Sequence, residues 1–175
     1  MSERLLQKAP ELLAYPDKAW WPRVQQLVAE LEGQWQKALA PWVEALQALA
    51  PEEREELYVR TFDFDPATTL EIGWHLFGED YRRGEFLASC RRLLAEVGVP
   101  EQGQLPDHAG LLLAALPALP PPKAEAFFAS FLHPGLEKIS SALAQRENPY
   151  RYLLEALDCA AAALTARAAV MGGSL

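Results

Sequence analysis

The sequence contains few of the residues that build metal centres or disulfide frameworks. It has two cysteines, Cys90 and Cys159, and three histidines in 175 residues. No CxxC motif occurs, and two thiolates are too few for the usual zinc cage. Both cysteines lie in apolar helical patterns, which is typical of buried thiols in a reducing compartment.

Positive charge is also in short supply. Sixteen Lys and Arg stand against 24 Asp and Glu, so the formal net charge is −8. A protein that binds nucleic acid through its phosphates needs a basic face, and we therefore expect no nucleic-acid partner. The acidity would suit a basic protein partner, although many soluble proteins are acidic for solubility alone.

Long apolar runs and a targeting signal are missing as well. The apolar stretches are too short or too interrupted to span a bilayer. The opening residues, "MSERLLQKAPELLAYPD", show no basic region followed by an apolar one, as a secretion signal would. We expect a cytoplasmic protein without stable membrane insertion.

Alternating β patterns bounded by hairpin turns do not occur, whereas helical periodicity is present in almost every segment. The apolar residues of 24–31, for example, recur at i, i+3, i+4 and i+7. The sequence predicts one all-α domain over residues 1–175. Within it, we expect Pro41 to kink or divide a helix, Gly135 to separate two helices and Asn148 to cap the final one.

Catalytic motifs are absent too. We find no GxxxxGK[ST], GxGxxG, HExxH or GxSxG pattern. The three histidines, His75, His108 and His133, are widely spaced and none pairs with a metal ligand at a usual interval. We expect no catalytic residue and no bound metal. The alternative from another class is a small helical metal-dependent enzyme built on His75, His108 and nearby carboxylates.

The stretch "QLPDHAGLLLAAL" places Pro106, Asp107 and His108 before an apolar run. Asp and His could form a dyad, but side chains at adjacent helical positions do not face each other. Asp is among the best N-cap residues, and Pro106 disfavours helix at the residue before it. The pattern predicts that Asp107 caps a helix whose apolar face includes Leu111, Leu112 and Leu116.

Several stretches, in order and over nearly the whole chain, carry a resemblance. They are "LLAYPD" followed by a tryptophan, "YVRTFDFDPATTLEIGWHLFGEDYRRGEFL", "QLPDHAGLLLAALPALP" and "QRENPYRYLLEALDCAA". This pattern is similar to that of the respiratory nitrate reductase assembly chaperones of the NarJ type, in the TorD-like group of molybdoenzyme maturation factors. Matching positions are Tyr58, Phe62-Asp63, Ala67-Thr68, Leu70, His75, Gly78-Glu79 and Arg83-Gly84. Ala109 departs from it, since relatives often have Leu there, and many relatives carry a polar tail beyond the last helix.

The resemblance implies a helical bundle of the TorD-like type that is not an enzyme and keeps no cofactor. Such chaperones bind the N-terminal segment of the apo catalytic subunit of nitrate reductase. They keep it competent for molybdenum cofactor insertion before it docks on the membrane subunit. The resemblance also favours a monomer over a dimer. Two alternatives remain open, namely a chaperone for another molybdoenzyme, such as a sulfoxide or N-oxide reductase, and a structural adaptor.

We expect the segment from Tyr58 to Gly78 to line part of a groove that receives a target helix. Phe62 and Leu70 would make apolar contacts, unless they are ordinary core, and carboxylates such as Asp63 would meet basic side chains. The 106–108 joint would shape the partner surface, with His108 adding a charge that titrates near about 6.5. The candidate partner-binding residues are Tyr58, Phe62, Asp63, Asp65, Thr68, Leu70, Glu71, His75, Pro106, Asp107 and His108.

Overall fold

The computed structural model describes residues 2–31 and 33–172, and within them it contains helices and no strand. The prediction of an all-α protein is confirmed. The α-helices are α1 (Ser2–Gln7), α2 (Ala9–Leu12), α3 (Trp20–Ala29), α4 (Gln34–Gln47), α5 (Pro51–Tyr58), α6 (Ile72–Phe77), α7 (Arg82–Val97), α8 (Ala109–Ala115), α9 (Pro121–Phe127), α10 (His133–Gln145) and α11 (Tyr150–Gly172). Short turns of other types are η1 (Val59–Asp63), η2 (Leu116–Ala118) and η3 (Phe128–Leu132), of which η1 and η3 are π-helical.

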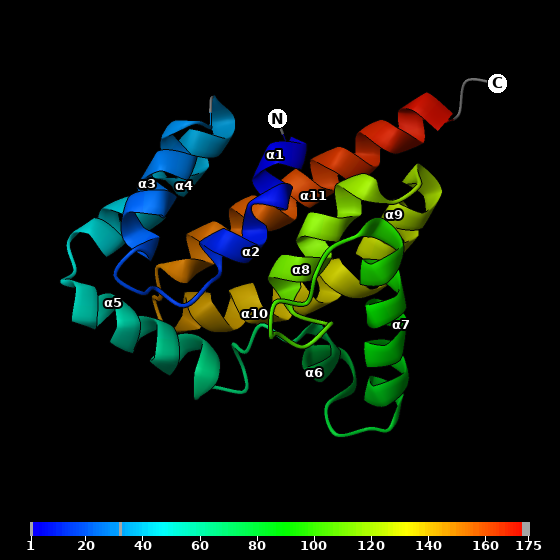
Figure 1. Cartoon of the computed structure of the whole chain (residues 1–175), viewed down its shortest axis with the longest axis horizontal. Coiled ribbons are helices and arrows are strands. Elements are labelled where there is room, and N and C mark those ends of the chain that lie inside the picture. The colour runs from blue at the N-terminus through cyan, green and yellow to red at the C-terminus, as the bar shows by residue number, and fades with distance from the viewer. Residues whose placement is uncertain (1, 32, 173–175) are drawn as a thin grey trace.

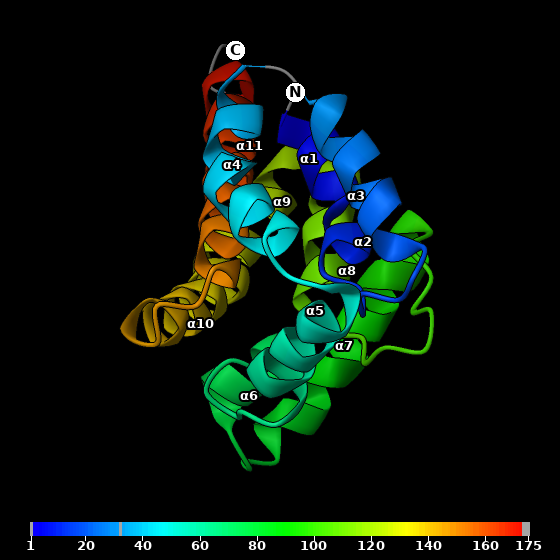
Figure 2. The same ribbon diagram turned by 90° about the vertical axis from the view of Figure 1, so that its left-hand side faces the viewer.

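Helix α11 is the longest element and organises the core. It packs against α1, α4, α9 and α10, and it crosses the molecule diagonally in Figure 1. Leucines and alanines make up most of its buried face, and the small alanines allow neighbouring helices to approach closely. Figures 1 and 2 both place α5 and α6 in the lower part of the molecule, joined by the segment that carries most of the candidate residues.

Local capping signals explain where several helices begin and end. The Asn148 side-chain oxygen accepts a hydrogen bond from Tyr150 N at 3.0 Å, so the predicted cap of α11 is confirmed. Gly98 follows α7 in the left-handed conformation, with φ of 75°, where glycine has no steric penalty. Among the described helices, none is long and apolar enough to cross a membrane.

Neither Pro41 nor Gly135 separates two helices, and the predicted break at Gly135 is wrong. Of the two outcomes expected at Pro41, a kink or a division, the division does not occur: Pro41 lies inside α4, and the buried side chains around it, such as Trp42 and Leu46, hold both halves against the core. Gly135 lies inside α10, and the π-helical turn η3 joins α9 to α10 directly. A Cβ at Gly135 would lie 2.9 Å from Ile72 Cγ2. The glycine therefore permits α6 to pack closely against α10.

Candidate functional site

The π-helical turn η1 follows α5, and the chain passes from the core to the surface at its end. Thr61 and Phe62 are buried, whereas Asp63 and Phe64 are exposed. The Phe64 side chain is 80% exposed, an unusual position for a large aromatic residue. π turns are rare and are frequently found at functional sites. The exposed end of η1 is therefore the starting point of the candidate site.

Tyr58 and Phe62 lie beneath this surface. The Phe62 ring lies 4.8 Å from that of Tyr150 in α11 and 5.1 Å from that of Tyr58, centroid to centroid. The Tyr58 hydroxyl donates a 2.9 Å hydrogen bond to the Leu13 carbonyl, and burial raises the pKa of Tyr58. These two aromatic residues attach η1 to the core, and the described structure leaves little of either side chain at the surface.

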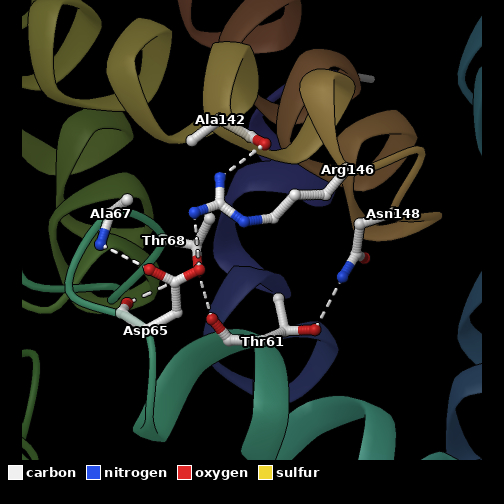
Figure 3. A network of polar contacts seen from close by, with 7 residues as sticks. All are labelled: Thr61, Asp65, Ala67, Thr68, Ala142, Arg146 and Asn148. Carbon is white, nitrogen blue, oxygen red and sulfur yellow. Dashed lines mark hydrogen bonds and ion pairs between the residues drawn. The ribbon is translucent and has the colours of Figure 1, made fainter.

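A polar network fixes the loop that follows η1 (Figure 3). The Thr68 hydroxyl donates to the Thr61 carbonyl, and Asn148 Nδ2 donates to Thr61 Oγ1 at 2.7 Å. Arg146 Nη2 lies 2.8 Å from Asp65 Oδ2. Thr68 is buried and Asp65 half-buried. Asp65 contacts the corner between α10 and α11 directly through Arg146, and Thr68 is connected to it through Thr61, which Asn148 contacts. The Asp65 carboxylate already has a cationic partner within the chain.

The chain then returns toward the core at Leu70, which is buried. Glu71 is half-buried, and its Oε2 accepts a 2.8 Å hydrogen bond from the Thr69 hydroxyl and lies 4.0 Å from Arg83 Nη2. His75 Nε2 donates to the Thr69 carbonyl at 2.7 Å. Burial lowers the pKa of His75, so the imidazole is neutral at neutral pH. His75 thus holds the loop and brings no charge to it.

Asp107 does not cap the helix that follows it, and this prediction is wrong. Its Oδ2 accepts a 2.8 Å hydrogen bond from Gly73 N, and its carbonyl accepts one from Ile72 N at 3.0 Å. Asp107 therefore caps α6, whose first amides have no partner inside that helix. The predicted helix does form as α8, with Leu111 and Leu112 buried, but its cap is His108.

His108 accepts a 3.1 Å hydrogen bond from Gly110 N through Nδ1. It is buried, and burial lowers its pKa to about 4. The prediction that His108 adds a charge near neutral pH is therefore wrong. Pro106, Asp107 and His108 are all buried and pair with the 70–73 segment through an antiparallel bridge between Glu71 and His108. They lie behind this segment and position it.

Two hollows that share Phe64 lie on the exposed side of these elements. The first is lined by Tyr15, Glu52, Glu55, Glu56, Val59, Arg60 and Phe64, and the second by Asp63, Phe64, Asp65, Pro66, Thr69, Glu71 and Trp74. Together they form what we call the acidic groove. Six carboxylates and one arginine line it, around the exposed Phe64 ring. Burial and the nearby Glu71 carboxylate raise the pKa of Asp63, which indicates mutual repulsion within the groove.

The groove brings together only some of the predicted residues. Asp63, Asp65 and Glu71 line it; Tyr58, Phe62, Thr68 and Leu70 support it from below. Tyr15 and Phe64 were missed. Tyr15 packs edge-on against Tyr58, 5.7 Å between ring centroids, from a segment more than forty positions away. The repeated Phe-Asp pattern of "FDFD" in the sequence draws attention to Phe64, but it does not indicate which of the two phenylalanines is exposed.

Among the residues that the structure describes, no group of three His, Cys, Asp or Glu side chains is arranged to hold a metal ion. His75 and His108 make separate contacts to backbone atoms rather than sharing a site. The described structure does not bring together the residues of the metal-enzyme alternative.

The family model described as nitrate reductase delta subunit matches residues 28–155, well over half of the chain. The chain belongs to this family. A Bacillus subtilis relative, named probable nitrate reductase molybdenum cofactor assembly chaperone NarJ, is 29% identical over 92% of this chain and 90% of its own length. The NarJ chaperone of Escherichia coli K12 is also 29% identical, over 83% of this chain and 64% of its own length. The nitrate reductase-like protein NarX of Mycobacterium tuberculosis is 25% identical, and the match covers 23% of it.

The resemblance to NarJ-type chaperones is thus confirmed at the level of the family. The NarJ relatives are named as assembly chaperones and not as catalysts. The matched range includes α5, η1 and the loop to α6, and hence every residue of the acidic groove except Tyr15.

Proposed function

We propose that this protein is an assembly chaperone for a respiratory nitrate reductase. It binds the N-terminal segment of the apo catalytic subunit in the acidic groove. Bound there, the segment stays competent for molybdenum cofactor insertion and does not dock prematurely on the membrane subunit. The chaperone acts as a monomer in the cytoplasm and performs no catalysis.

The acidic groove is the observation that carries this proposal. An amphipathic helix binds through apolar anchors, and Phe64, Tyr15 and Trp74 offer aromatic surface for them. The carboxylates around Phe64 favour a target with Lys or Arg beside its apolar face. Asp63 directly precedes Phe64, is exposed and has no ion-pair partner in the described chain, whereas Asp65 is paired with Arg146.

Calorimetric titration with the N-terminal peptide of the catalytic subunit from the same organism tests this. We expect saturable one-to-one binding that weakens as salt increases, because the contacts with carboxylates are exposed. Phe64→Ser and Asp63→Ala should each raise the dissociation constant, by about tenfold for Phe64→Ser, which removes the central aromatic anchor.

Glu44→Ala is the matched control. Glu44 is an exposed carboxylate on α4 outside the groove, so its loss changes the net charge as Asp63→Ala does and should leave binding unchanged. If Asp63→Ala and Glu44→Ala weakened peptide binding equally, the loss would follow from the change in net charge alone. That result would contradict binding in the acidic groove. A peptide that shows no saturable binding would leave the family assignment intact and favour another molybdoenzyme client.

The chaperone step needs a separate measurement in cells. We expect the catalytic subunit purified from cells that carry Phe64→Ser to contain less molybdenum than that from cells with the unchanged chaperone or with Glu44→Ala. An unchanged molybdenum content together with weakened peptide binding would separate binding from cofactor insertion and contradict the second half of the proposal.

A further inference from the structure

A second hollow, of about 590 Å³, lies between α7 and the α9–η3 segment. Its floor consists of Phe77, Phe86, Phe127 and Phe131 together with Leu93, and we call it the phenylalanine groove. The rings form a continuous row: centroids are 5.5 Å apart for Phe77–Phe86, 5.3 Å for Phe86–Phe131 and 5.7 Å for Phe127–Phe131. Three of the phenylalanines are only half-buried, so the row forms an apolar surface that faces solvent.

The walls of this groove fit a helix. Helix α7 packs on α6 and α8, while α9 packs on α11, and no helix of the described chain covers the hollow between α7 and α9. Phe86 and Leu93 are seven positions apart on α7, which corresponds to roughly 10 Å along a helix axis. A helix bound alongside would present its residues i, i+3 or i+4, and i+7 over the same length. As at the acidic groove, a π turn, η3, lies at the edge and carries Phe131.

The rim of the phenylalanine groove differs from that of the acidic groove. Arg82, Arg92 and Lys123 lie on it beside two glutamates. Arg82 is paired with Asp80 at 3.1 Å, and Lys123 with Glu96 at 2.6 Å. Arg92 Nη2 donates to the Ser89 hydroxyl at 3.1 Å, but no carboxylate of the described chain lies within 4.0 Å of it. The rim therefore carries three cations against two carboxylates, Glu85 and Glu96, whereas the acidic groove carries one cation against six carboxylates.

We propose that the phenylalanine groove is a second docking site, for an amphipathic helix of a protein partner. The helix carries large apolar side chains at i, i+3 or i+4, and i+7, and a carboxylate that pairs with Arg92. This partner helix is acidic, whereas the segment proposed to bind the acidic groove is basic. The two grooves therefore bind different segments and do not compete for one.

Fluorescence anisotropy with two labelled synthetic helices tests the proposal on the full chain. The first probe has leucines at i, i+3, i+4 and i+7 flanked by glutamates; the second has lysines in place of these glutamates. Ser89→Trp fills the groove from an exposed position on α7, and Ala88→Trp adds the same side chain at the neighbouring exposed position, outside the groove. Arg92→Glu reverses the charge on the rim, and Phe64→Ser alters only the acidic groove.

We expect the glutamate helix to bind the unchanged protein and Ala88→Trp equally, and at least about tenfold more weakly to Ser89→Trp and Arg92→Glu. Phe64→Ser should leave its affinity unchanged and should weaken the lysine helix instead. Absence of saturable binding of the glutamate helix, or equal affinity for Ser89→Trp and Ala88→Trp, would overturn the proposal. Neither result would contradict the proposal for the acidic groove, because binding at that groove is measured separately with Phe64→Ser and the lysine helix.

Discussion

Asp107 caps helix α6 from 34 positions away, through the 2.8 Å hydrogen bond from Gly73 N to its Oδ2. The same residue accepts from Ile72 N through its carbonyl, and Ala109 N donates to the Leu70 carbonyl at 2.7 Å. These contacts hold the 70–73 segment against the start of α8. Glu71, which lines the acidic groove, lies in the middle of this segment. Asp107 is thus a buried support for the groove.

Removal of the cap should destabilise the fold. We expect Asp107→Ala to lower the free energy of unfolding by about 2 kcal/mol, because Gly73 N loses its acceptor in a buried position. Asp107→Asn keeps an acceptor oxygen and should cost less than half as much. Urea unfolding followed by tryptophan fluorescence measures both. Equal losses for the two variants would mean that the charge matters and the acceptor does not.

The buried His108 should make stability depend on pH. Its pKa is about 4 in the folded chain, below the ordinary value of 6.5, so the unfolded chain binds more protons between these values. Stability therefore rises with pH across this window and is lost on acidification, by at most about 3 kcal/mol. His108→Asn keeps a good capping side chain and should reduce the loss between about pH 7 and about pH 5 in urea unfolding.

His133 provides a control of opposite sign. Its ring lies 2.9 Å from the Asp158 carboxylate, and this hydrogen bond raises the pKa of His133. Its contribution is present at low pH and is lost as pH rises through the raised pKa. His133→Asn should therefore lose stability more steeply on acidification than the unchanged protein. A shallower loss than in the unchanged protein would contradict this assignment.

Two glycines inside helices should respond oppositely to alanine. A Cβ at Gly135 meets Ile72 Cγ2 at 2.9 Å and Cδ1 at 3.0 Å, so Gly135→Ala should cost about 1–3 kcal/mol through overpacking. At Gly84 in α7 nothing lies within 4 Å of the added atom. Gly84→Ala should stabilise the protein by about 0.5–1 kcal/mol through helix propensity. Thermal and urea unfolding of both variants test the close approach of α6 and α10.

The two phenylalanines of "FDFD" should separate stability from binding. Phe62 is 4% exposed and packs on Tyr150, so Phe62→Ala should cost about 3–5 kcal/mol. Phe64 is 80% exposed, and Phe64→Ser should change stability by less than about 0.5 kcal/mol while it weakens the client peptide. A large stability loss for Phe64→Ser would show that its ring is packed in solution and would remove it from the site.

The amino-acid sequence determined the helices and several of their ends. Apolar residues recur with the helical period, and periodicity depends only on residues that are close along the chain. The Asn148 cap is likewise local, because its acceptor and the Tyr150 amide are two positions apart. The family pattern also identified Asp63, and Asp65 and Glu71 were expected beside it as carboxylates of the same segment; all three line one hollow.

The tertiary structure alone decided which of these residues reach the surface. Gly73, the hydrogen-bond partner of Asp107, lies 34 positions away along the chain. Ile72, which packs against Gly135, belongs to another helix. The π turn η1 set Phe62 inward and Phe64 outward, and Tyr15 joined the groove from the distant N-terminal segment. Such contacts depend on how helices pack, and packing brings together residues whose separation along the chain carries no periodic signal.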